Sequence, residues 1–320
     1  MTLEPEIRAF VARSLEFLAP GYQDEPVAEQ RRRYAELCRA YDLGRPLGLE
    51  VRDLEIPGPA GAIPARLYRR PEAGSRAAQA GLVYLHGGSW YLGGLDSHDS
   101  IVAELAERAG IAVVAVDYRL APEHRFPAAC DDALAALDWV AANAAALAID
   151  PARLGVGGDS AGGNLAAGLA LAARDRGAPR LKAQLLVYPL LDRHDPAGDS
   201  GDASGDPGAA GAPLLEAEEI RFAIRCYAGA EALPDDPRAA PLLAGAFSGL
   251  PPAAILAAEA DPLRADAERY AAALRAAGVA VDLELARGVV HGFLRARRES
   301  PESGRAFAWL CAAAQRGLDA

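Results

Sequence analysis

Lysine is almost missing from this chain of 320 residues. Lysine and arginine together number 33, of which Lys182 is the one lysine, and 44 aspartate and glutamate residues leave a formal net charge of −11. A single lysine argues against a Schiff-base mechanism, which needs a lysine amine as the nucleophile. The negative charge repels phosphate backbones at long range, so we expect no nucleic-acid partner.

Cysteines are few, and long apolar runs are missing. The four cysteines form no CxxC pair, which argues against a zinc site and a dense disulfide framework. No apolar run reaches the roughly 18 to 20 residues that cross a bilayer. The start MTLEPEIRAF also lacks the basic segment and apolar block of a secretory signal. We therefore expect a cytoplasmic protein without membrane contact and with reduced thiols at Cys38, Cys130, Cys226 and Cys311.

The first part of the chain predicts two amphipathic helices. Apolar residues recur at helical spacing over residues 7–18 and again over about 25–41. The run Arg31-Arg32-Arg33 falls within the second helix, and we interpret it as the solvated face of that helix.

From about residue 49, short apolar runs alternate with helical patterns. Several runs are continuously apolar, as expected for parallel strands that are buried on both faces. This alternation predicts an open α/β sheet with helices on both faces. The candidate strands are 51–56, 63–68, 82–85, 112–116, 154–156, 183–188, 253–257 and 281–285, and the candidate helices are 97–109, 128–147, 161–176, 263–277 and 303–318.

One segment interrupts the alternation. Residues 195–213 have the composition of a loop, and a short helical pattern follows at 216–227. We interpret this stretch as an excursion out of the sheet and not as a separate domain.

The strongest local signal for chemistry is the G-x-S-x-G sequence centred on Ser160. An apolar strand pattern precedes it and a helical pattern follows it, which is the setting that a nucleophile elbow requires. The serine hydroxyl would then lie at a helix N-terminus, where the dipole favours negative charge. The overlapping Gly155-Val156-Gly157 begins like a dinucleotide-binding loop, but Ser160 occupies the third glycine position and the strand comes late in the chain, which disfavours that interpretation.

A second signal is the sequence LHGGSW at residues 85–90, directly after an apolar strand. Acyl transfer develops an oxyanion, and backbone N–H groups aimed at it typically supply a few kcal/mol. A glycine run lets the backbone approach the substrate closely enough to do so. On its own this sequence would fit a plain strand-to-helix turn equally well.

A serine nucleophile needs a base and an acid that orients the base. His291 follows the last strand and, unlike His194 in the loop excursion, is C-terminal to Ser160 on the sheet. Asp261 ends an apolar strand, whereas Asp266 lies inside the following helix and should face elsewhere, with Glu259 as the other rival. The order Ser160, Asp261, His291 is that of α/β-hydrolases. The remaining histidines are His86, His98 and His124.

With these motifs the chain resembles the hormone-sensitive-lipase family of α/β-hydrolase carboxylesterases. The resemblance implies the α/β-hydrolase fold, with a mostly parallel eight-stranded sheet, helices on both faces and a helical cap. The matching stretches run through most of the chain in the family's order: HGGSW at 86–90, DYRLAPEHRFPAA at 117–129, GDSAGG at 158–163, YPLLD at 188–192, DPLRAD at 261–266 and HGF at 291–293.

The resemblance also assigns roles. It implies that Ser160 is the nucleophile, Asp261 the orienting acid and His291 the general base. It places the oxyanion donors at the backbone N–H groups of Gly88, Ser89 and Ala161. The family usually has glycine where this chain has Ser89, so a side chain is expected near the acyl or alcohol pocket.

The same resemblance implies the domain organisation. Residues 1–45 would be cap helices and residues 46–320 the catalytic domain, with a cap insertion at about 193–235. It also implies that Arg119 and Glu123, in the YRLAPE stretch, support the site structurally and take no part in catalysis.

These observations predict a serine carboxylesterase that needs no cofactor or metal and hydrolyses short- to medium-chain acyl esters through an acyl-enzyme. Its partner would be a small-molecule ester, and the resemblance allows a monomer or a homodimer. Two alternatives stay open: an amidase or deacetylase with the same triad, and a ligand-binding member of the fold without catalysis.

Overall fold

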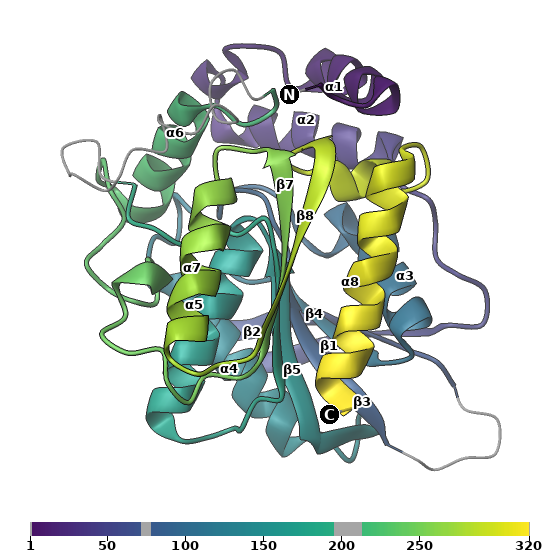
Figure 1. Ribbon diagram of the computed structural model, residues 1–320, viewed down its shortest axis with the longest axis vertical. Coiled ribbons are helices and arrows are strands. Elements are labelled where there is room, and N and C mark those ends of the chain that lie inside the picture. Colours follow the sequence, from purple (N-terminus) through teal and green to yellow (C-terminus); the bar gives the residue numbers. More distant parts are fainter. Residues whose placement is uncertain (1, 72–77, 195–212, 320) are drawn as a thin grey trace.

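A sheet of eight strands forms the middle layer of the molecule (Figure 1). The structure is a computed structural model that describes residues 2–71, 78–194 and 213–319. Within these ranges the strands lie in the order β1-β2-β4-β3-β5-β6-β7-β8. Their bounds are β1 Glu50–Gly58, β2 Gly61–Arg69, β3 Gln79–Leu85, β4 Ala112–Val116, β5 Ile149–Asp159, β6 Ala183–Val187, β7 Ala253–Ala260 and β8 Val281–Val290.

Strand direction brings most of the carboxyl ends to one edge of the sheet. β1 and β2 form an antiparallel hairpin, and β2 is also antiparallel to β4. From β4 to β8 every neighbouring pair is parallel. Open α/β sheets place their sites at this edge. The predicted α/β-hydrolase architecture is therefore confirmed.

Two hydrophobic cores cover the two faces of the sheet. Along β4, Val114 and Val116 belong to one core and Val113 to the other, because successive side chains of a strand point to opposite faces. Helices α4 (Ala128–Ala142), α5 (Ala161–Arg176) and α7 (Arg264–Ala276) close the first core, and helices α3 (Asp99–Ala109) and α8 (Pro301–Asp319) close the second (Figure 1).

Three further helices lie across the carboxyl edge of the sheet: α1 (Pro5–Phe17), α2 (Val27–Ala40) and α6 (Ala217–Ala228), at the top of Figure 1. Helix α1 buries Ile7 and Phe10 beneath it. This is the place that the predicted cap would occupy. Part of the predicted cap insertion, residues 195–212, lies outside the described residues.

The predicted boundaries between α4 and β5 are wrong. The alanine-rich sequence predicts a helix up to residue 147 and a strand from 154, whereas α4 ends at Ala142 and β5 begins at Ile149. Asn143 ends the helix by donating its side-chain amide to the Trp139 carbonyl oxygen at 2.8 Å. Pairing of Ile149 with Gln79 of β3 then extends the strand, which is a long-range contact that the local sequence does not encode.

The interpretation of Arg31 as part of a solvated face is also wrong. Its guanidinium donates to the carbonyl oxygens of Tyr91 and Ala121, both at 2.8 Å, and pairs with Glu123 at 2.7 Å. It thereby ties α2 to the loops below it. Arg119 pairs with the buried Asp132, so Arg119 and Glu123 both make the structural contacts expected of them.

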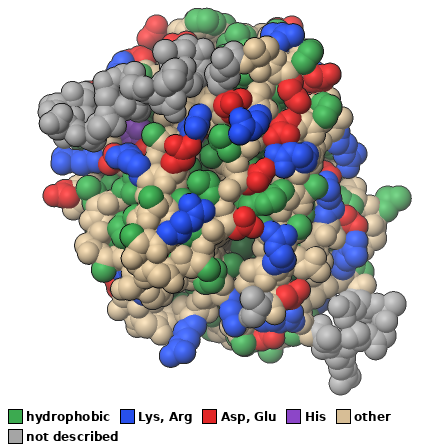
Figure 2. Space-filling model, in the orientation of Figure 1, with side chains coloured by type: hydrophobic (Ala, Val, Ile, Leu, Met, Phe, Trp, Pro, Cys, Tyr) green, Lys and Arg blue, Asp and Glu red, His purple; other side chains and the backbone are tan. Residues whose placement is uncertain are grey.

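Acidic and basic side chains are interspersed on the face shown in Figure 2, with apolar patches between them. Arg264 and Glu268 form one ion pair, at 2.8 Å, and Arg305 and Glu302 another, at 2.6 Å. Among the described helices, none combines the length and the apolar character that a membrane span requires.

Candidate active site

Ser160 lies in a sharp turn between β5, which ends at Asp159, and α5, which begins at Ala161. Its backbone has φ 54° and ψ −119°, a conformation that non-glycine residues rarely adopt. The amide of Ser160 donates to the Val187 carbonyl oxygen of β6 at 2.9 Å, which holds the turn against the neighbouring strand.

The glycine that follows this turn allows the close approach of helix α5 to strand β3. A Cβ atom on Gly162 would lie 1.9 Å from the carbonyl oxygen of Leu85. No side chain fits at that distance, so the strand–turn–helix packing requires glycine at this position. The turn therefore presents the Ser160 hydroxyl into the space above the carboxyl edge of the sheet.

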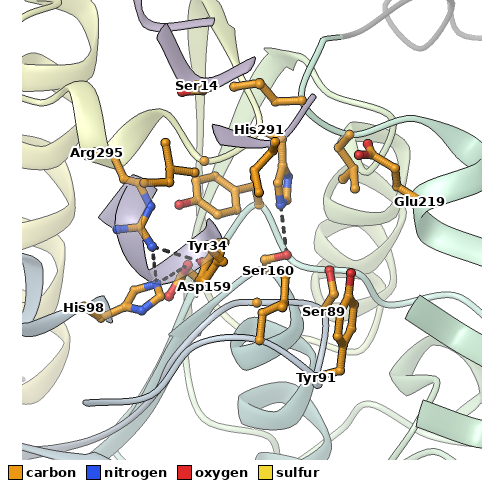
Figure 3. Close-up of a pocket in the computed structure, with 18 of the residues that line it drawn as sticks. Ser14, Tyr34, Ser89, Tyr91, His98, Asp159, Ser160, Glu219, His291 and Arg295 are labelled. Carbon is orange, nitrogen blue, oxygen red and sulfur yellow. Dashed lines mark hydrogen bonds and ion pairs between the residues drawn. The ribbon is translucent and has the colours of Figure 1, made fainter. Parts of the chain in front are cut away.

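The structure brings Ser160, His291 and Asp261 into one line of contacts (Figure 3 shows the first two). His291 Nε2 lies 2.9 Å from Ser160 Oγ, and His291 Nδ1 lies 2.7 Å from Asp261 Oδ2. Asp261 is 1% exposed, and its Oδ1 accepts the Leu263 amide at 2.8 Å. The carboxylate is therefore fixed in orientation and can in turn fix the imidazole.

Neighbouring elements place the three side chains. Asp261 directly follows β7 and His291 directly follows β8, and the two strands are paired in parallel. The ring of Tyr188, just after β6, packs against the imidazole of His291 with 4.6 Å between centroids. The imidazole is thus held both by a carboxylate and by an aromatic ring.

The rival acids face away from His291, as expected for Asp266. Its carboxylate accepts the amides of Leu191 and Asp192 and lies 2.9 Å from His194 Nε2. Glu259 accepts the Gly288 amide at 2.8 Å. The other histidines are occupied elsewhere or exposed: His86 stacks on Tyr118, His98 contacts Asp159, and His124 is exposed.

The predicted oxyanion donors Gly88, Ser89 and Ala161 lie close to Ser160 in the chain or in the cavity. Gly88 and Ser89 line the same cavity as Ser160, and Ala161 is the next residue of the elbow. Within the described ranges, none of these three amides has a hydrogen-bond acceptor. Ser89 has a positive φ of 55°, and its side chain lies beside Tyr91 in the cavity wall (Figure 3).

The cavity above Ser160 has a volume of about 110 Å³. Its upper wall comes from α1, α2 and the helix α6, which contribute residues that the sequence motifs do not mark. Their amphipathic spacing predicted burial but not what the apolar face would cover. They are Phe10, Ser14, Leu18, Tyr34, Leu37 and Glu219.

Two charged residues stand at opposite sides of this cavity (Figure 3). Glu219 accepts the Gln23 side-chain amide at 2.7 Å, and burial raises the pKa of its carboxyl above the usual range. Arg295 donates to the Ser97 carbonyl oxygen at 2.9 Å and to the Tyr34 hydroxyl at 3.0 Å. No sequence motif marks either residue.

A serine, a histidine and an aspartate in hydrogen-bond contact, in the chain order Ser–Asp–His at the carboxyl edge of a mostly parallel sheet, define the class of α/β-hydrolases. The family model described as the α/β-hydrolase fold matches residues 82–295 of the chain. That span contains every one of the site residues discussed above except those from the first 40 residues, which are Phe10, Ser14, Leu18, Gln23, Tyr34 and Leu37.

Several named relatives are esterases. The carboxylic ester hydrolase LipN of Mycobacterium tuberculosis is 42% identical over 299 residues, covering 92% of this chain and 77% of the relative. The ethyl acetate hydrolase of Pseudomonas putida is 40% identical over 308 residues, covering 92% and 93%. A hyperthermophilic esterase from the archaeon Pyrobaculum calidifontis superimposes with a TM-score of 0.90 at 35% identity over the whole of both chains. The chain belongs to the hormone-sensitive-lipase family of α/β-hydrolase carboxylesterases.

Proposed function

We propose that this enzyme is a serine carboxylesterase whose nucleophile, base and orienting acid are Ser160, His291 and Asp261. The observation that carries the proposal is the unbroken contact from Ser160 Oγ through the imidazole to the Asp261 carboxylate, at 2.9 and 2.7 Å. Ser160 and His291 line the cavity together with Gly88 and Ser89, whose amides have no acceptor within the described ranges.

The mechanism follows from these positions. Ser160 attacks the ester carbonyl while His291 Nε2 takes the hydroxyl proton, and Asp261 stabilises the imidazolium that forms. The amides of Gly88, Ser89 and Ala161 hold the oxyanion of the tetrahedral intermediate. His291 then protonates the leaving alcohol, which leaves an acyl-enzyme. Water, deprotonated by His291, hydrolyses the acyl-enzyme by the same route.

The substrate is a small uncharged ester with a short to medium acyl chain. The modest cavity and the partly apolar wall from α1, α2 and α6 support this size class. The relative named for ethyl acetate points the same way. Residues 1–45 and an insertion at about 193–235 form the cap of the catalytic domain, which spans residues 46–320.

We also propose that the enzyme is cytoplasmic and is a monomer or a homodimer. The four cysteines are free thiols in the structure, which supports a reducing cytoplasmic setting. A monomer and a homodimer are distinguished by light scattering on the purified enzyme.

The test is hydrolysis of p-nitrophenyl esters from acetate to palmitate, with Ser160→Ala in parallel. We expect the highest kcat/KM at short to medium chains and loss of turnover in the folded variant. Appreciable hydrolysis by folded Ser160→Ala would contradict the assignment. Comparison of an anilide with the matched phenyl ester tests the amidase alternative, which predicts that the anilide is cleaved at a comparable rate.

A further inference from the structure

Asp159, the residue before the nucleophile, is a buried carboxylate that the mechanism above does not use. It is 5% exposed. Its Oδ1 accepts the Gly87 amide at 3.0 Å and the Tyr84 hydroxyl at 2.7 Å, and its Oδ2 lies 3.2 Å from His98 Nε2. Gly87 is the residue directly before the oxyanion donor Gly88.

The surroundings keep this carboxylate ionised. Burial by itself would raise the pKa of Asp159, but the charge and hydrogen bonds of His98, Tyr84 and Arg295 hold it well below its usual range. Arg295 Nη2 lies 3.5 Å from His98 Nε2. Figure 3 shows Asp159, His98 and Arg295 grouped on one side of the cavity, next to Ser160. A charged acceptor makes a stronger hydrogen bond to an amide than a neutral acceptor does.

The loop at residues 86–90, which carries the proposed oxyanion donors Gly88 and Ser89, lies directly against Asp159. A Cβ atom on Gly87 would be 2.4 Å from Asp159 Oδ2 and 2.8 Å from its carbonyl oxygen. The loop therefore meets both the backbone and the side chain of the residue that immediately precedes Ser160. The next residues, Gly88 and Ser89, have φ values of 128° and 55°. The loop therefore departs from regular secondary structure at the two residues whose amides are the proposed oxyanion donors.

We propose that Asp159 is a positioning residue for the oxyanion hole: its ionised carboxylate holds the Gly87 amide, and thereby the Gly88 and Ser89 amides, at a fixed place relative to Ser160. His98 orients the carboxylate from the other side. The inference rests on the proposed function, because it gives Gly88 and Ser89 the role of oxyanion donors. A misplacement of about 1 Å in a catalytic array costs on the order of a hundredfold in rate.

The experiment compares Asp159→Ala with Asp266→Ala as the matched control. Asp266 is likewise a buried aspartate that accepts backbone amides and contacts a histidine, but it faces away from His291. We measure kcat and KM on p-nitrophenyl butyrate at a temperature where circular dichroism shows both variants folded. We also measure inhibition by an alkyl trifluoromethyl ketone, which forms an oxyanion with the serine, and by the matched methyl ketone.

For Asp159→Ala we expect kcat to fall by about a hundredfold, with KM and methyl-ketone inhibition within about threefold of the parent enzyme. The affinity for the trifluoromethyl ketone should fall by the same factor as kcat. Asp266→Ala should lose stability but keep kcat within about threefold. Asp159→Ala with nearly unchanged kcat, or an equal kcat loss in both variants, overturns the proposal.

If Asp159→Ala does not fold, Asp159→Asn serves as the second variant that tests the proposal. It retains the shape of the side chain but loses the charge, so kcat and trifluoromethyl-ketone affinity should fall in parallel, by about tenfold. Unchanged kcat in this folded variant, or a kcat loss without loss of ketone affinity, also overturns the proposal. An inactive parent enzyme would instead refute the proposed function.

Discussion

The indole of Trp90 stacks on the ring of Tyr227, with centroids 4.5 Å apart and planes 6° from parallel. Trp90 directly follows Ser89 in the loop at residues 86–90, and Tyr227 lies near the end of α6. Both rings are almost fully buried. Helix α6 is thus packed onto the chain segment that carries Gly88 and Ser89, the proposed oxyanion donors.

Truncation of Tyr227 should uncouple α6 from this loop. We expect Tyr227→Ala to lower the free energy of unfolding by about 3 to 5 kcal/mol, as for other buried aromatic residues, and to lower kcat as well. Tyr227→Phe keeps the stacking and loses one contact, from the hydroxyl to Cys130 Sγ at 3.3 Å, so it should cost only about 1 kcal/mol. Urea unfolding and ester hydrolysis measure both effects. An equal loss of stability in the two variants would contradict the role given to the stacked rings.

Replacement of the orienting acid tests the tautomer of His291. Asp261→Asn keeps an oxygen for the Leu263 amide but turns an N–H₂ group toward His291 Nδ1, which favours the wrong tautomer. By analogy with serine proteases, kcat should fall by roughly a thousandfold to ten-thousandfold with little change in KM. Steady-state kinetics on p-nitrophenyl butyrate provide the measurement. A variant within tenfold of the parent kcat would show that Asp261 is not the orienting acid.

The family resemblance implies glycine at the position that Ser89 occupies in this chain. Because its φ is 55°, glycine at this position removes backbone strain, and because its side chain lines the cavity, glycine also enlarges the pocket. We expect Ser89→Gly to keep kcat on acetate within about threefold and to keep stability within about 1 kcal/mol. Relative activity on longer or branched acyl esters should rise. An unchanged acyl-chain profile would show that the Ser89 side chain does not limit the pocket.

The pair His194–Asp266 should make stability depend on pH. Burial alone would lower the pKa of His194, but the carboxylate of Asp266, with Asp192 nearby, raises it above its ordinary value against the opposing charge of Arg269. Burial alone would raise the pKa of Asp266, but His194 and two amides lower it to about 2. A raised histidine pKa stabilises the fold below about pH 6.5, and that contribution is lost as pH rises through the folded-state pKa.

The depressed Asp266 pKa contributes stability above about pH 4, which is lost as pH falls toward about 2.

Because the pKa of His194 is raised in the folded state, we expect the free energy of unfolding of the parent enzyme to fall more steeply than that of His194→Gln between about pH 6 and pH 9. Urea titrations of both proteins at each pH measure this difference. Parallel pH profiles would exclude a contribution from this pair.

Sequence reasoning located the parts of the site that are encoded locally. Around Ser160 the strand, the glycines and the helix are consecutive, so the turn and its nucleophile follow from short-range geometry. The loop at Gly88 and Ser89 is also encoded locally, because its glycines directly follow an apolar strand. The alternation of apolar strands and amphipathic helices likewise predicted the sheet and its layers, because burial on two faces imposes it.

Contacts between segments that are distant in the sequence can be seen only in the tertiary structure. Ser160 and His291 are 131 residues apart, and only strand order makes Asp261, and not Asp266, the acid that meets the imidazole. The link from Asp159 to Gly87 spans 72 residues and carries no motif of its own. The sequence also does not predict that α1, α2 and α6 form the cavity wall. An amphipathic helix shows in its sequence which face is buried, but packing alone decides what that face covers.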